Sequence, residues 1–213
     1  MGISGFFREP APVRKRGEIL CWAAGSLAAG ILLGVFSKWL DAMSIDDGIW
    51  WQRIFGALDL RNIFSELPVW LLLGTVIAAF SGTAGQAAGN VFLFFAGMTV
   101  SYHGYTVWVC GFNPWRYMLI WYGITLLSPL AAVFCWCAGG RTRAAGILQV
   151  ALYSVMLFFV LHAGWLYLDV GRLADLLFLA LMAAALWQGP KKTGLRLAAA
   201  VMLRVAAGWL IGF

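Results

Sequence analysis

Charged residues are scarce in this chain of 213 residues. They make up 11% of the sequence, whereas hydrophobic residues make up 62% and the mean hydropathy is +0.85. A soluble domain is about 25% charged and about 45–50% apolar, so this chain has too much apolar surface to hide from water. The composition excludes an ordinary soluble protein and predicts an integral membrane protein with a single domain over residues 1–213.

The sequence also lacks the usual enzyme motifs. It contains no HExxH, no GxSxG, no phosphate-binding Walker loop and no dinucleotide fingerprint. No pair of acids lies within the apolar runs, as an intramembrane aspartyl protease would require. We therefore expect neither an enzyme nor a cofactor, and an unfamiliar intramembrane enzyme is only the third choice.

Cysteine and histidine are few, with four and two copies. Cys21, Cys110, Cys135 and Cys137 all lie in or beside apolar runs, and none has CxxC spacing. This pattern favours small packing residues over a disulfide framework. No third ligand stands at a diagnostic distance from a histidine, so we expect no metal site.

Seven apolar segments are candidates for membrane spans, each of which needs about 17–25 mostly apolar residues. They cover residues 19–40, 66–81, 86–109, 116–138, 144–168, 172–188 and 193–213. The predicted fold is an all-α, polytopic transmembrane helix bundle. Arg204 falls near the middle of the seventh segment, where a cation costs at least about 2.5–3.5 kcal/mol. Either it pairs with an acid such as Asp175, or this segment lies on the inner surface and six spans remain.

The basic residues predict the orientation, because inner loops of membrane proteins are rich in lysine and arginine. With the N-terminus inside, the inner segments hold Arg8, Arg14, Lys15, Arg16, Arg141, Arg143, Lys191, Lys192 and Arg196. Residues 1–18 then form a cytoplasmic tail, and the first apolar run is a retained span rather than a cleaved signal. The net charge of +6 reflects these helix ends and does not indicate nucleic-acid binding.

The longest outer connection, residues 45–64, has an amphipathic pattern. Trp51, Ile54, Phe55 and Leu58 share one face at helical spacing. We expect an interfacial helix on the outer membrane surface, with an ordinary ordered loop as the alternative.

Small residues recur at intervals of four in two spans. Ser26, Gly30 and Gly34 lie in the first, and Gly85 and Gly89 lie at the start of the third. Such spacing predicts close contact between helices.

A polar run, residues 101–123, interrupts the apolar pattern. Thr99, His103, Thr106 and Cys110 form one helical stripe, which should face protein or water and not lipid. His162 falls in the fifth segment at a depth similar to that of His103, in the outer half of the membrane.

These polar residues suggest a solute site. The candidate substrate-binding residues are His103, His162, Tyr102, Tyr105, Asn113, Arg116 and Trp121. The leading hypothesis is small-solute binding or transport through an outward-facing polar pocket. The alternative is a non-transporting accessory or scaffold protein, in which the histidines only fasten helices by hydrogen bonds. The partners we expect are the lipid bilayer and a small solute; no nucleic acid is expected, and an oligomer or partner subunit is compatible with the sequence.

Two groups of charged residues at the predicted outer ends of the spans each allow two interpretations. Lys38 and Asp41 form an i, i+3 pair that suits either a solvated helix end or the mouth of a pocket. Arg116, between Trp115 and Tyr117, suits either an interfacial anchor or a cationic rim for an anionic ligand.

Several strings resemble one known family. They are GVFSKWLD (34–41), LRNIFSELPVW (60–70), NVFLFFAGM (90–98), SYHGYT (101–106), GFNPWRYM (111–118) and IWYGITLLSP (120–129). Together they resemble a family of small, uncharacterised polytopic membrane proteins from low-GC Gram-positive bacteria, over about the first two-thirds of the chain. The resemblance implies a bacterial cytoplasmic-membrane location and carries over no site residues.

Overall fold

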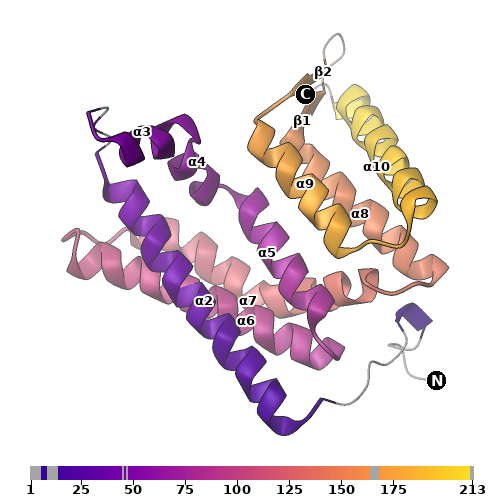
Figure 1. The fold of residues 1–213 in the computed structure, drawn as a ribbon, viewed down its shortest axis with the longest axis horizontal. Coiled ribbons are helices and arrows are strands. Elements are labelled where there is room, and N and C mark those ends of the chain that lie inside the picture. The colour runs from indigo at the N-terminus through magenta and orange to yellow at the C-terminus, as the bar shows by residue number, and fades with distance from the viewer. Residues whose placement is uncertain (1–5, 9–13, 45, 47, 164–167, 212–213) are drawn as a thin grey trace.

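The computed structural model describes the chain except for residues 1–5, 9–13, 45, 47, 164–167 and 212–213. The helices are α2 (Arg16–Ala42), α3 (Trp50–Ala57), α4 (Leu60–Ser65), α5 (Leu67–Phe80), α6 (Ala84–Trp108), α7 (Trp115–Ala138), α8 (Arg143–Val160), α9 (Leu173–Ala185) and α10 (Pro190–Ile211). Two short antiparallel strands, β1 (Leu161–Ala163) and β2 (Leu168–Val170), connect α8 to α9 (Figure 1).

A helix covers most of every segment that hydropathy predicted to span the membrane. Among the described residues, α2, α7 and α8 are long and apolar enough to cross a membrane, and α5 and α9 are shorter apolar helices. The chain is therefore all-α in its main architecture and compatible with a membrane-embedded bundle. The number of seven spans stays a prediction. Helix α2 begins at Arg16, so it takes up the last residues of the expected tail over 1–18.

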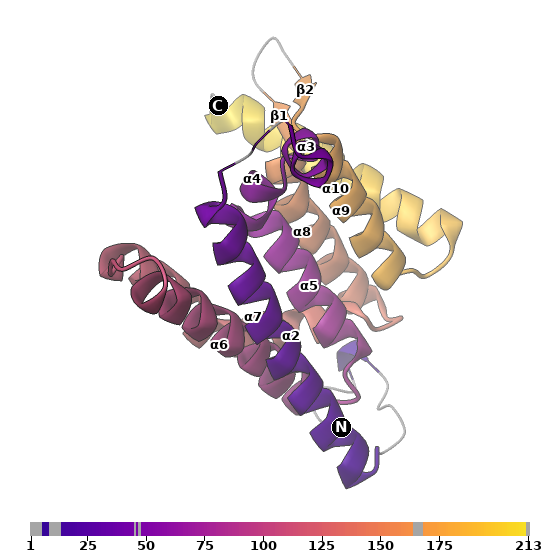
Figure 2. The ribbon, with the colours of Figure 1, turned by 60° about the vertical axis from the view of Figure 1, so that its left-hand side comes forward.

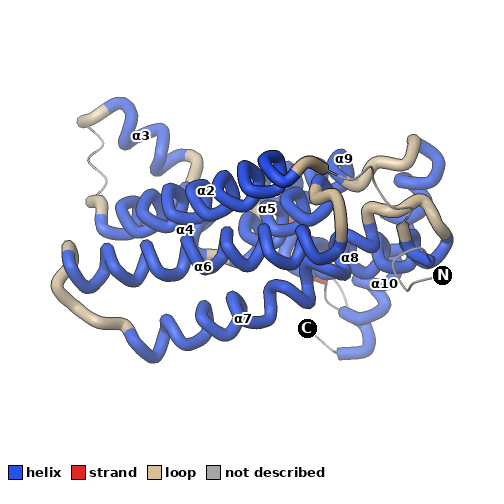
Figure 3. The backbone as a smooth tube through the Cα atoms, turned by 90° about the horizontal axis from the view of Figure 1, so that it is seen from below, coloured by secondary structure: helices blue, strands red, loops and turns tan. Residues whose placement is uncertain are grey.

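The bundle has two halves that meet at α5. Trp70, Phe94 and Trp136 belong to one buried cluster, which α5 shares with α6 and α7. Met156 and Met182 belong to a second cluster, on α8 and α9, which also includes residues of α5. In Figure 1, α5 lies between the group of α2, α6 and α7 and the group of α8, α9 and α10. Figure 3 shows α2, α6 and α7 side by side.

The closest helix contact joins α2 to α6 through glycines. A Cβ atom on Gly30 would lie 2.0 Å from the Phe94 carbonyl oxygen, and one on Gly34 would lie 2.4 Å from that of Met98. On the facing helix, a Cβ on Gly97 would lie 2.7 Å from the Leu27 oxygen. Residue numbers rise together along both helices, so α2 and α6 run parallel. Only glycine allows the two backbones to approach this closely.

The small-residue pattern predicted this contact only in part. Ser26, Gly30 and Gly34 are buried on α2, as expected. Gly85 and Gly89 are not contact points, because a Cβ on either would meet nothing within 4 Å. The partner glycine on α6 is Gly97, which stands outside the pattern read from the sequence.

The fifth predicted segment, 144–168, is wrong at its C-terminal end. Helix α8 stops at Val160, and the chain turns into a hairpin in which His162 pairs with Asp169. The Gly171 amide donates to the Val160 carbonyl oxygen at 2.9 Å and closes the hairpin. Apolar composition alone does not separate a helix from a short strand. Residues 164–167 lie outside the described part.

The expected helix over 45–64 is two helices, α3 and α4. They are separated at Leu58 and Asp59, and Asp59 has a left-handed backbone with φ of 53°. Aspartate is one of the few side chains that adopts this conformation readily. The Trp51 ring stacks on Trp39 of α2 at 6.2 Å, so α3 packs against the end of α2.

Most carboxylates gather at one end of the bundle, together with cations such as Lys38 and Arg172, whereas a cluster of basic side chains lies at the other end. The acidic end contains the C-terminus of α2, α3, α4 and the hairpin (Figure 2); its carboxylates are Asp41, Asp46, Asp59, Glu66, Asp169 and Asp175. The basic end contains the start of α2 and the α7–α8 and α9–α10 connections; its cations are Arg8, Arg14, Arg141, Arg143, Lys191, Lys192 and Arg196. This separation follows from the alternating direction of successive long helices.

Arg172 fastens the two halves together at the acidic end. Its guanidinium lies 3.4 Å from Asp175 and 3.4 Å from Asp59, and it also pairs with Glu66. Burial lowers the pKa of Arg172, but the neighbouring carboxylates of Asp175 and Glu66 outweigh that effect and raise it. The cation is therefore held firmly charged between α4, α5 and α9.

Arg204 does not pair with Asp175, which is occupied by Arg172. Instead the buried guanidinium of Arg204 lies 5.1 Å from the ring centre of Phe158 on α8. A desolvated cation over an aromatic face gains about 2 kcal/mol or more. Helix α10 thus packs along α8 with its cation shielded by the bundle.

The α2–α6 contact predicts that Gly30→Val lowers the unfolding free energy by about 3 kcal/mol, because the new side chain meets a backbone atom that cannot rotate away. Thermal unfolding in detergent measures this. The matched control is Gly25→Val, on the same helix, where a Cβ meets nothing within 4 Å. Equal melting temperatures for the two variants would contradict the glycine contact.

Candidate functional site

The polar stripe of α6 faces α7 inside the bundle. Thr99 is fully buried, and its hydroxyl lies 2.9 Å from that of Thr125 on α7. Thr106 is also buried and donates to the Tyr102 carbonyl oxygen at 2.8 Å. The expectation that the stripe faces protein or water is met by Thr99 and Thr106, whereas Cys110 lies beyond the end of α6. His103 is half-buried on the same side of α6 and contacts Tyr122 of α7.

His103 is held by two partners at the acidic end. Its Nδ1 lies 2.8 Å from the Tyr122 hydroxyl, and its Nε2 lies 2.9 Å from Asn113 Oδ1. The Trp115 ring lies 6.1 Å from the imidazole. A neutral ring with hydrogen on Nε2 donates to Asn113 and accepts from Tyr122, so one tautomer satisfies both nitrogens. The structure therefore brings together His103 and Asn113, two of the residues that the sequence predicts for one site.

A wide groove of about 780 Å³ runs beside His103. It lies between α2 and α6, and its lining includes His103, Tyr105 and Tyr122 next to many apolar side chains such as Ile31 and Val100. Such an apolar groove on the outside of a membrane bundle suits lipid chains. His103 therefore lies at the edge of an apolar surface of the bundle.

His162 does not join His103. It lies in strand β1 and is exposed, with Asp169 opposite it in the hairpin. It lines none of the described cavities that surround His103 or Asp41. The expected pocket between two histidines is therefore not formed, because the helix that was to carry His162 ends two residues earlier.

Arg116 also stays apart from the cavities. It lies in the first turn of α7 and is exposed. Neither the groove beside His103 nor the cavity beside Asp41 includes it in its lining. This position suits the interfacial anchor better than the cationic rim.

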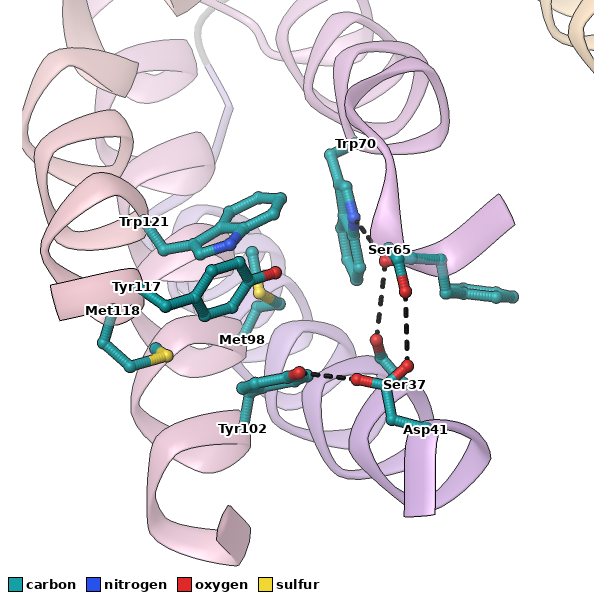
Figure 4. Close-up of a pocket in the computed structure, with 10 residues that line it drawn as sticks. Ser37, Asp41, Ser65, Trp70, Met98, Tyr102, Tyr117, Met118 and Trp121 are labelled. Atoms are coloured by element: carbon teal, nitrogen blue, oxygen red, sulfur yellow. Dashed lines mark hydrogen bonds between the residues drawn. The ribbon is translucent and has the colours of Figure 1, made fainter. Parts of the chain in front are cut away.

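The remaining two candidates, Tyr102 and Trp121, do line a common cavity, which we call the Asp41 cavity. It has a volume of about 10 Å³, room for about one water molecule. Five helices contribute to it; its lining consists of Ser37, Asp41, Phe64, Ser65, Trp70, Met98, Tyr102, Tyr117, Met118 and Trp121. Figure 4 shows the Tyr117 and Trp121 side chains across the cavity from Trp70.

The Asp41 carboxylate is the charged group of this cavity. The Tyr102 hydroxyl donates to Asp41 Oδ2 at 2.5 Å (Figure 4). The Ser65 hydroxyl lies 3.2 Å from Asp41 Oδ1 and shares its one hydrogen with the Arg61 carbonyl oxygen at 2.8 Å. The Trp70 indole donates to the Phe64 carbonyl oxygen at 3.0 Å, which fixes the opposite wall. The carboxylate is thus oriented by hydroxyl donors from α6 and α4.

Lys38 brings an ammonium group to the same carboxylate from outside the cavity lining. Its Nζ lies 3.9 Å from Asp41 Oδ2, 5.2 Å from the Tyr102 ring centre and 5.4 Å from that of Phe112. The Lys38 side chain is only 10% exposed. The pair is therefore no solvated helix end. Its i, i+3 spacing was visible in the sequence, but the aromatic rings beside it come from α6 and the α6–α7 connection.

The different surroundings of the two histidines lead to a test. His103→Phe should lower the unfolding free energy by about 1–2 kcal/mol, because Tyr122 and Asn113 lose their partner. His162→Phe replaces an exposed side chain and should change it by less than about 0.5 kcal/mol. Thermal or denaturant unfolding in detergent compares them. A larger loss from the His162 variant would contradict the placement of the two side chains.

The site is interpreted from its geometry, because comparisons with known proteins found no match. No protein-family model, curated protein or solved structure matches the chain.

Proposed function

We propose that this chain is a multi-pass membrane protein that binds a small organic ammonium solute in the Asp41 cavity, as the recognition step of uptake or sensing. One observation carries the proposal: a carboxylate stands among aromatic rings in a cavity shared by five helices. Aromatic faces and a carboxylate together are the groups that recognise ammonium ions. An ionisable side chain kept at this position in a membrane protein also favours a functional role.

The chain's own lysine supports the choice of a cation. Lys38 places its ammonium between Asp41 and two aromatic rings, which is the arrangement that a solute ammonium would occupy. A free solute therefore competes with Lys38. Lys38 does not line the cavity, so a solute that pairs with Asp41 displaces the Lys38 ammonium from the carboxylate. Because the cavity has room for about one water molecule, binding also widens it. The displacement of Lys38 couples the solute to the end of α2.

The membrane topology is part of the same proposal. Seven spans, formed by α2 and α5 to α10, place the basic end inside and the acidic end outside, in accordance with the positive-inside rule. The Asp41 cavity then opens toward the outer face of a bacterial cytoplasmic membrane. A cysteine placed near the C-terminus of α10 should be labelled from outside by an impermeant reagent.

A second candidate, an accessory or scaffold protein without a solute, is favoured by the His103 cluster. Both nitrogens of His103 are engaged by Tyr122 and Asn113, as expected for a side chain that only fastens helices. If none of a series of ammonium compounds stabilised the wild-type protein, this role would be preferred.

The competition with Lys38 gives the main test of the proposal. Lys38→Met keeps the length of the side chain and removes the competing charge, so it should bind tetramethylammonium or methylammonium more tightly than wild type. Asp41→Asn removes the carboxylate and should weaken binding at least about tenfold, the equivalent of about 1.4 kcal/mol. Titration calorimetry in detergent measures both affinities.

The matched control is Asp46→Asn, which neutralises an exposed carboxylate in the α2–α3 connection, five residues after Asp41. It should bind like wild type. Equal losses from the Asp41 and Asp46 variants would indicate general charge attraction, and unchanged affinity in Lys38→Met would contradict the competition.

A further inference from the structure

A second polar cavity lies at the basic end of the bundle, whereas the Asp41 cavity lies at the acidic end. Its volume is about 520 Å³. Three segments form it: the N-terminal turn, the α7–α8 connection and the α9–α10 connection. Its lining consists of Arg8, Gly139, Gly140, Arg141, Thr142, Trp187 and Gln188. We call it the basic cavity.

Specific contacts hold the three segments around this cavity. The Thr142 hydroxyl donates to the Phe7 carbonyl oxygen at 3.0 Å, and the Gln188 amide donates to the Gly140 carbonyl oxygen. A Cβ on Gly140 would lie 2.0 Å from the Phe7 oxygen, so glycine is needed for the N-terminal turn to approach. The cavity is therefore a built feature of the fold and not a gap between unconnected loops.

The charge of the basic cavity is positive. Arg8 lies 5.1 Å from the ring centre of Trp136 and donates to the Ala79 carbonyl oxygen at 3.0 Å, which leaves its other nitrogens for a ligand. Arg141 is exposed beside it. No described carboxylate lines the cavity, and Glu9 lies outside the described residues. Burial lowers the pKa of Arg8, because desolvation disfavours the charged form.

The N-terminus of α8 adds to this positive potential. Thr142 is the N-cap of α8, and its hydroxyl accepts from the Ala145 amide at 3.2 Å. The first turn of a helix carries a partial positive charge. Both arginines and this helix end therefore favour an anion in the same cavity.

Gln188 supplies a hydrogen-bond acceptor, whereas the arginines supply hydrogen-bond donors. Its Oε1 atom is buried and has no hydrogen-bond partner in the structure. A buried acceptor without a donor costs free energy, so this oxygen suits a ligand that brings a hydroxyl or ammonium hydrogen. A ligand that satisfies the whole cavity thus has an anionic group and a donor a few atoms apart.

The position of the basic cavity indicates where such a ligand comes from. It lies where α7 and α9 end and α8 and α10 begin, at the border of the apolar helices. Trp187 is 59% exposed at this level, in the manner of the aromatic residues that mark a membrane interface. Lipid headgroups occupy this level of the bilayer, and basic pockets between spanning helices bind anionic headgroups.

We propose that the basic cavity binds the headgroup of an anionic phospholipid that carries a hydroxyl group, with phosphatidylglycerol as the fitting chemistry. Arg8 and Arg141 hold the phosphate, and Gln188 Oε1 accepts from the headgroup hydroxyl. The lipid thereby ties the N-terminal turn to the α7–α8 and α9–α10 connections.

Native mass spectrometry of the purified full chain with added lipids tests this. Phosphatidylglycerol should be retained more strongly than phosphatidylcholine, which has no net charge, and than phosphatidic acid, which has no headgroup hydroxyl. Arg141→Gln should weaken retention of phosphatidylglycerol about fivefold, the effect of about 1 kcal/mol for one cation near a lipid phosphate. Arg141 is exposed, so this variant should fold normally.

The matched control is Arg143→Gln, which removes the same charge from the next exposed arginine, outside the cavity lining. It should retain phosphatidylglycerol like wild type. Equal losses in both variants, or equal retention of phosphatidylcholine, would overturn the proposal. Displacement of the lipid by millimolar glycerol 3-phosphate would also overturn it, because a soluble phosphate would then be the ligand.

Discussion

The close approach of α2 to α6 is the constraint on which the acidic end depends. The two helices run parallel and touch through Gly30, Gly34 and Gly97, where a side chain would collide with backbone atoms. This contact fixes the register between them. It carries the end of α2 alongside the polar part of α6, so that Asp41 reaches the Tyr102 hydroxyl. A looser contact would separate the carboxylate from the aromatic rings that give it a chemical role.

Most polar side chains inside the bundle have partners, as a low-dielectric environment demands. Thr99 bonds with Thr125, and His103 bonds with Tyr122 and Asn113. Against this background the unusual groups are informative. Asp41 shares a small cavity with aromatic rings, and the Gln188 oxygen is buried without a donor beside a cavity lined by arginines. Asp41 has partners in Tyr102 and Lys38, and it is unusual because it is a carboxylate among aromatic rings. Among the described residues, Arg14, Tyr153 and Arg204 also have a buried side-chain atom without a hydrogen-bond partner. The two proposed ligands follow from the Asp41 carboxylate and the Gln188 oxygen.

Hydropathy predicts the seven main helices, because a long apolar run favours a helix that is buried or embedded in a membrane. It could not predict where a helix stops inside such a run, so His162 was placed in a helix although α8 ends at Val160. A residue pattern along one helix also cannot predict which side chains of two different helices contact each other. For that reason the sequence indicates Tyr102 and Trp121 as site candidates, whereas it allows Asp41, which completes their cavity, to be either a solvated helix end or part of a pocket mouth.

The central claim is that a solute ammonium replaces Lys38 beside Asp41. The reactivity of the lysines toward an amine-specific acylating reagent, quantified by mass spectrometry with and without tetramethylammonium, tests it most directly. Lys38 is shielded in the structure, with 10% of its side chain exposed, so it should react slowly alone and several-fold faster with the ligand. Lys191 and Lys192, at the opposite end, should not change. A Lys38 reactivity that stays constant at saturating tetramethylammonium would contradict the account.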